Sequence, residues 1–181
     1  MWQHSGVPSS QTLSLADRRV VAAWAADCAD RVLGLFESEA PHDQRPRDAI
    51  ARARAFARGE LDAAGEIRNR FLAGRAARDV TSASAVAAAR SAAQAAAVAH
   101  MGAHALGAAA YAVKAVALAP NTAPTAAEEE VDWQLDQLDE RTRSALALLP
   151  PPGEDSAGPL GSGLLASGVL GEVIRRLQAS L

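Results

Sequence analysis

The chain is poor in the residues that cross-link or decorate many small proteins. Its 181 residues include one cysteine, and only 4% are aromatic. A single cysteine excludes an internal disulfide and any metal site built from several cysteines. Lys114 is the only lysine and Tyr111 the only tyrosine, so the segment that holds both, residues 99–115, stands out from an otherwise apolar part of the chain.

The sequence also lacks alternating patterns, the pattern of a signal peptide in residues 1–10, and a strong net charge. No alternation of apolar and polar residues is typical of a strand. The apolar segment 83–119 contains Arg90 and Lys114, and each charge would cost about 2.5–3.5 kcal/mol at a bilayer centre, so we expect buried helices instead. Residues 1–10 do not have the pattern of a signal peptide, and we expect a cytoplasmic protein. A net charge of −3 argues against a general role in binding nucleic acid.

Alanine takes the place of the missing large residues. It occupies 45 of the 181 positions. Alanine has the highest helix propensity, and its small side chain lets helices approach closely. We predict an all-α fold, a single-domain, alanine-rich bundle of about six helices with a tethered C-terminal helix. The heavy use of alanine and arginine is also typical of GC-rich genomes such as those of actinobacteria.

The pattern of caps, apolar spacings and breakers predicts how the chain is divided. Residues 1–12 are expected to be a disordered lead, and residues 13–149 a helical domain. Inside this domain, helices are predicted at 14–39, 46–58, 60–79 and 82–100, then from a break near 100–103 up to 119, and at 125–148. Residues 150–163, rich in Pro, Gly and Ser, are expected to be a linker. Residues 164–181 are predicted to form an amphipathic helix that docks on its own domain or, in a homodimer, on a second subunit.

Particular residues are expected at the helix starts and in the core. Ser14 and Thr81 are the predicted caps of the first and fourth helices, and Asp43 is a candidate cap for the second, with Pro46 in its first turn. With so much alanine, the few large side chains should contribute most of the buried apolar area. These are Trp24, Leu33, Leu35, Phe36, Ile50, Phe56, Ile67, Phe71, Tyr111 and Trp133.

Four polar side chains, His100, His104, Tyr111 and Lys114, would form one stripe on a continuous helix. A neutral imidazole accepts a proton near neutral pH. The stripe could therefore belong to a cofactor-independent acid/base enzyme, for example a dehydratase or cyclase of secondary metabolism. A histidine would be the base, and Tyr111 or Lys114 the acid or oxyanion partner. The alternative is structural, with the four groups tying alanine-rich helices together through hydrogen bonds. A break near Gly102 would instead let the two imidazole rings face each other across a turn.

The spacing of the histidines also raises the question of a metal. Histidines at i and i+4 are the metal-binding half of the H-E-x-x-H motif, but the acid is missing because residue 101 is Met. A third ligand would have to come from elsewhere, such as Asp27 or Cys28. Cys28, however, falls on a predicted buried stripe with Trp24, where we expect it to pack in the core. We therefore predict no metal site and no cofactor.

Charge is distributed in two blocks. Arginines are concentrated between residues 41 and 78, and residues 128–140 hold seven acids and no base. Arg45 and Arg47 lie near a predicted helix start, where they could bind a carboxylate or phosphate. The favoured alternative is pairing with Glu37, Glu39 or the acids of 128–140. The candidate partner-binding residues are Arg45, Arg47, Arg52, Glu128, Glu129, Asp132 and Asp136.

Four segments together resemble a known family. They are DRRVVAAWAADCADRVLGLFE, DQRPRDAIARARAFARGE, AVAHMGAHALGAAAYAVKAV and VDWQLDQL. In these segments the chain is similar to bacterial immunity proteins, small all-α proteins that are associated with polymorphic toxin systems. The resemblance covers about residues 16–143 and does not extend past residue 150. It implies a cytoplasmic protein that binds and neutralises a cognate protein toxin, and it supplies no catalytic residues. The acid/base enzyme with a small-molecule substrate is the alternative.

Overall fold

The computed structural model describes residues 9–69 and 71–181, apart from the side chains of residues 67–69. The described residues form helices and no strand, which confirms the all-α, single-domain prediction. Residues 1–8 of the expected lead and the side chain of Ile67 lie outside the described part. None of the helices in that part is long and apolar enough to cross a membrane.

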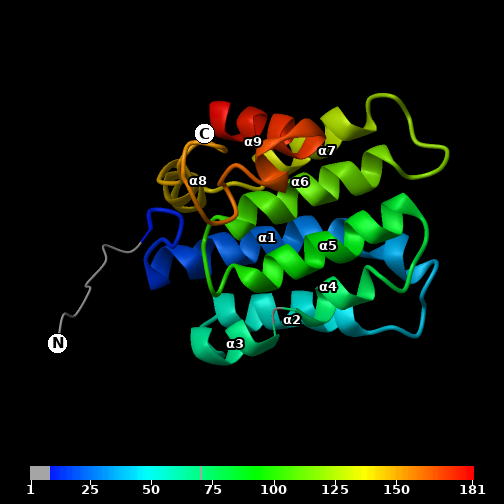
Figure 1. The fold of residues 1–181 in the computed structure, drawn as a ribbon, viewed down its shortest axis with the longest axis horizontal. Helices are drawn as coiled ribbons and strands as arrows, with labels where there is room; N and C mark the ends of the chain where they lie inside the picture. Colours follow the sequence, from blue (N-terminus) through cyan, green and yellow to red (C-terminus); the bar gives the residue numbers. More distant parts are fainter. Residues whose placement is uncertain (1–8, 70) are drawn as a thin grey trace.

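Three long helices form the centre of the molecule (Figure 1). They are α1 (Leu15–Glu37), α5 (Ala83–Ala97) and α6 (His104–Ala117), and each packs on the other two. Both α5 and α6 are buried on nearly all sides, as their apolar composition predicts. Most of the residues between them are alanine. Because the helices approach closely, the Ser91 hydroxyl on α5 can donate to the Ala108 carbonyl on α6 at 2.7 Å.

Shorter helices cover one side of this centre. They are α2 (Arg45–Ala57), α3 (Ala63–Asn69) and α4 (Leu72–Ala76), seen below α1 and α5 in Figure 1. The single helix predicted at 60–79 is therefore wrong, since the structure has two short helices in that range. Gly65 and Gly74 weaken helix formation there. The side chain of Phe71, expected in the core, is 57% exposed.

The other side is covered by the C-terminal half of the chain. Here lie α7 (Ala126–Asp136), α8 (Glu140–Ala147) and α9 (Gly168–Ala179). The continuous helix predicted at 125–148 is wrong, because Asp139 starts a new helix. Its carboxylate accepts a hydrogen bond from the backbone N–H of Thr142 at 2.7 Å. Hydrogen bonds from the hydroxyl and from the backbone N–H of Thr142 lower the pKa of Asp139.

Two of the predicted caps can be compared with the observed ones. Ser14 caps α1 as expected, with its hydroxyl accepting from the backbone N–H of Asp17 at 3.1 Å. The fourth helix is capped by Ser82, one residue later than the predicted Thr81. Thr81 instead donates its hydroxyl hydrogen to Glu39, which comes from the turn after α1. Thr81 is therefore engaged by Glu39, which is distant in the sequence, and the cap of α5 lies one residue later than predicted.

The C-terminal helix docks on its own domain. Figure 1 shows α9 lying along α6, on the side away from α5. Its apolar side chains Leu170, Val173, Ile174 and Leu177 are buried there. The apolar face of α9, which was expected to dock somewhere, is thus buried against α6 of the same chain.

The segments before α1 and before α9 are held together. Residues 9–12 form a turn, and the side chain of Gln11 is fully buried. The backbone carbonyls of Thr12 and Gln11 accept hydrogen bonds from the N–H groups of Gly102 and Ala103, at the start of α6. Leu160, inside the expected linker, is also fully buried. The segment before α1 therefore packs against the turn between α5 and α6, and it also contacts the segment before α9 through Gln11.

Candidate functional site

The two histidines lie at the turn between α5 and α6. Helix α5 ends at Ala97 and α6 begins at His104, so the break expected near 100–103 is confirmed. The backbone carbonyl of His100 accepts a hydrogen bond from Arg18 at 3.2 Å. His104 Nδ1 lies 2.8 Å from the side-chain oxygen of Gln94, on the facing helix. Both rings are half-buried against neighbouring structure.

Tyr111 and Lys114 lie farther along α6 in a different environment. Seven residues separate His104 from Tyr111, which corresponds to about 10 Å along a helix axis. Tyr111 and Lys114 line a hollow of about 270 Å³ between α5 and α6, and neither histidine is part of its lining. The structure thus divides the expected stripe into two separate pairs.

Cys28 is a core residue. Its side chain is fully buried, and burial followed by the negative charge of Glu130 raises the pKa of the thiol well above its usual value. A buried thiol of this kind is a poor nucleophile and a poor metal ligand. Among the described residues, no group of three or more His, Cys, Asp and Glu side chains is placed to hold a metal ion.

The arginines of α2 are paired within the chain. Arg47 binds Glu37 through two hydrogen bonds of 2.8 Å, which is one of the pairings expected from the sequence. Arg52 pairs with Glu66, whose side chain is 3% exposed. Their neighbours follow the same rule: Arg45 pairs with Asp43 and Asp79, Arg54 with Asp27 and Asp30, and Arg58 with Glu60. Much of the positive charge of this face is compensated by the chain's own carboxylates.

Helix α7 has one buried polar face and one exposed acidic face. Glu130 and Gln134 point inward and are buried. The carboxylates of Glu128, Glu129, Asp132 and Asp136, all named from the sequence as partner-binding candidates, are exposed. We call these four residues the acidic face.

The buried side of α7 fixes the helix to the core. Glu130 accepts a hydrogen bond from Arg31 at 2.9 Å, and the Arg31 guanidinium stacks over the Trp133 ring, 3.9 Å from its centroid. The indole N–H of Trp24 donates to the backbone carbonyl of Gln134 at 2.9 Å. Trp24 lies in the core as predicted, but its polar bond depends on how α1 and α7 pack and could not be read from the sequence. The acidic face is consequently carried by a well-anchored helix.

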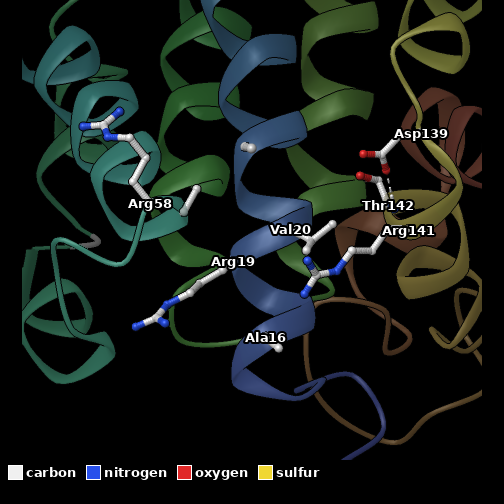
Figure 2. Close-up of a pocket in the computed structure, with 9 residues that line it drawn as sticks. Ala16, Arg19, Val20, Arg58, Asp139, Arg141 and Thr142 are labelled. Atoms are coloured by element: carbon white, nitrogen blue, oxygen red, sulfur yellow. Dashed lines mark hydrogen bonds between the residues drawn. The ribbon is translucent and has the colours of Figure 1, made fainter.

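A second, larger hollow lies along α1. It has a volume of about 520 Å³, and Arg19, Arg58 and Arg141 contribute to its lining. Figure 2 shows Arg141 extending from α8 toward Val20 on α1. Arg58 is engaged by Glu60, and Arg19 lies over the Phe56 ring, 6.0 Å from its centroid. Sequence reasoning did not single out Arg19 or Arg141, because the hollow forms only where α1 and α8 meet.

The fold and these surfaces define a small all-α protein with a buried alanine-rich centre and charged outer helices. Residues 11–141 match the family model described as Imm-5 like putative immunity protein, and the chain belongs to this family. The match spans most of the chain and indicates an immunity-like role with a protein partner. No curated protein and no solved structure matches the chain.

Proposed function

We propose that this protein is a cytoplasmic immunity protein that binds and neutralises a cognate protein toxin, and that it does so through the acidic face of α7. The observation that carries the proposal is the family match over residues 11–141. Blocking would be steric and electrostatic. No cofactor enters the proposal, and it assigns no role to a homodimer, because α9 buries its apolar side chains on its own α6.

Charge availability favours the acidic face over the arginine face of α2. To bind a partner through α2, its arginines would first have to break ion pairs within their own chain. These arginines are Arg45, Arg47 and Arg52. Three carboxylates of the acidic face form no ion pair within the described residues, and Asp132 alone pairs, with Arg176 at 3.3 Å. Exposed charges of one sign on a rigid helix accelerate association with an oppositely charged partner.

An immunity role predicts a toxin gene beside the gene for this chain, and the test uses the toxin domain that such a gene encodes. Co-expression should restore growth of cells that produce this domain, and the purified proteins should form a complex. Failure of both would overturn the proposed function.

A matched pair of triple variants tests the surface. Glu128→Gln, Glu129→Gln and Asp136→Asn together should lower the association rate constant about tenfold at low salt, because rim charges act mainly on this rate. The control triple, Asp48→Asn, Glu154→Gln and Glu172→Gln, removes the same charge from other exposed positions and should leave the rate nearly unchanged. Equal effects would exclude the acidic face. A selective loss in Arg47→Gln would move the contact to α2.

A further inference from the structure

The polar side chains that line the hollow between α5 and α6 can all donate hydrogen bonds. Its lining consists of Ala83, Val86, Ala87, Arg90, Tyr111, Lys114 and Leu118. Two of these side chains are cations and one is a phenol, and the lining includes no acid. The polar part of this hollow therefore offers hydrogen-bond donors and positive charge.

The phenol of Tyr111 is the innermost of these groups. The residue is only 5% exposed, and its hydroxyl forms no hydrogen bond within the described part of the chain. The hydroxyl oxygen is not among the fully buried side-chain atoms that lack a partner, so it reaches the open space of the hollow. Because Tyr111 lines the hollow, a bound molecule could supply the partner.

The two cations line the same hollow as Tyr111. The guanidinium carbon of Arg90, on α5, is 5.9 Å from the centroid of the Tyr111 ring. Lys114 follows Tyr111 by three residues on α6, which puts both on one face of the helix. Neither cation forms an ion pair within the described residues, in contrast to all four arginines of α2. Three donors thus border one space without an acceptor.

The rest of the lining is apolar and sets the shape of a ligand. Val86 and Leu118 supply the larger apolar surfaces, and Leu118 is 46% exposed at the edge. A volume of about 270 Å³ lies just below the range of about 300–1,000 Å³ typical of small-molecule sites, so only a small ligand fits. The chemistry that suits these walls is one anionic group attached to a short apolar chain.

We propose that this hollow is a binding site for a small organic monocarboxylate. The carboxylate accepts hydrogen bonds from Arg90, Lys114 and the Tyr111 hydroxyl, and the apolar chain lies along Val86 and Leu118. This site is separate from the acidic face of α7, so the test of this site is independent of the test of the proposed toxin contact.

The single tyrosine gives a direct readout of this site. Protein labelled with fluorotyrosine has one fluorine NMR signal, because Tyr111 is the only tyrosine. Titration with sodium hexanoate should shift that signal saturably, with a Kd of the order of 1 mM for so small a ligand. Hexanol and hexylamine, with the same chain but no carboxylate, and inorganic phosphate, with no chain, should not produce this shift at equal concentration and ionic strength.

Variants then assign the donors. Arg90→Met and Lys114→Met should each weaken hexanoate binding about tenfold, since each removes a charge-assisted hydrogen bond. Arg141→Met, which removes an arginine from the hollow along α1, is the control and should bind as wild type does. Tyr111→Phe should weaken the binding measured by calorimetry. No saturable shift with hexanoate, an equal shift with hexanol, or an equal shift with phosphate would each overturn the proposal on the wild-type protein alone.

Discussion

Gln11 and Leu160 lie 149 residues apart in the chain, and the side-chain oxygen of Gln11 accepts a hydrogen bond from the backbone N–H of Leu160 at 2.8 Å. The amide nitrogen of the same side chain donates to the carbonyl of Ala157 at 2.6 Å. The backbone carbonyl of Gln11 meanwhile accepts from Ala103, at the start of α6. One buried residue thus connects the beginning of the chain, the turn between α5 and α6, and the segment that leads to α9.

Gln11→Ala should therefore destabilise the protein although no apolar side chain is removed. The substitution leaves the buried backbone N–H of Leu160 without its partner, at about 1–3 kcal/mol, and it also removes the hydrogen bond to the carbonyl of the exposed residue Ala157. We expect a lower Tm and faster hydrogen exchange in residues 155–165. Gln137→Ala, at an exposed position after α7, is the control and should change the free energy of unfolding by less than about 0.5 kcal/mol. Equal Tm values for the two variants would contradict the role given to Gln11.

This contact between residues 9–12 and the segment 150–163 could not be predicted from the sequence. Residues 9–12 and 150–163 are polar or rich in Pro and Gly, a composition that favours loops. The local sequence pattern does not indicate whether two such segments contact each other in the fold. Here Gln11 supplies the donor and acceptor that the backbone of the second segment needs, and the two segments become ordered together.

The helices that depend on local signals were easier to predict. The start of α1 follows from Ser14 and the spacing of the residues after it, and the break before α6 follows from Gly102. The ion partners of the arginines were harder. Arg45 reaches Asp79 only because the end of α4 packs beside the start of α2, which no spacing in the sequence reveals.

Glu39 predicts a pH dependence of stability. Its carboxylate accepts hydrogen bonds from Ser82 and from Thr81 just before α5, and these bonds lower its pKa to about 2. Because the folded pKa lies below that of the unfolded chain, the ionised carboxylate stabilises the fold above about pH 4.5, and this contribution is lost as the pH falls toward 2.

The measurement is the difference in Tm between wild type and Glu39→Gln. It should be largest at about pH 7, smaller at about pH 4 and smallest at about pH 2, where the carboxyl is about half protonated in the folded chain. Glu154→Gln, the same substitution on an exposed loop, serves as the control for general charge effects. A difference that stays constant over this pH range would refute the assignment.

Gly107 explains how Gln94 reaches His104, and it leads to the last prediction. A Cβ at Gly107 would overlap the side-chain oxygen of Gln94 and would approach Leu165 to 3.0 Å. The missing side chain therefore leaves room for Gln94 to cross α6 and contact the His104 ring at 2.8 Å. Gly107→Ala gains helix propensity, but it displaces this hydrogen bond and crowds the core, so we expect a net loss of roughly 1–2 kcal/mol.

Gly34→Ala is the matched control for this effect. Gly34 also lies in a helix, but a Cβ there meets nothing within 4 Å. Alanine at this position should raise the free energy of unfolding by about 0.4–1 kcal/mol. A double-mutant cycle completes the test: with Gln94→Ala in place the obstacle is gone, so Gly107→Ala should cost less than in the wild-type background. If Gly107→Ala lowers the free energy of unfolding equally in both backgrounds, the close approach of Gln94 does not explain the requirement for glycine at position 107.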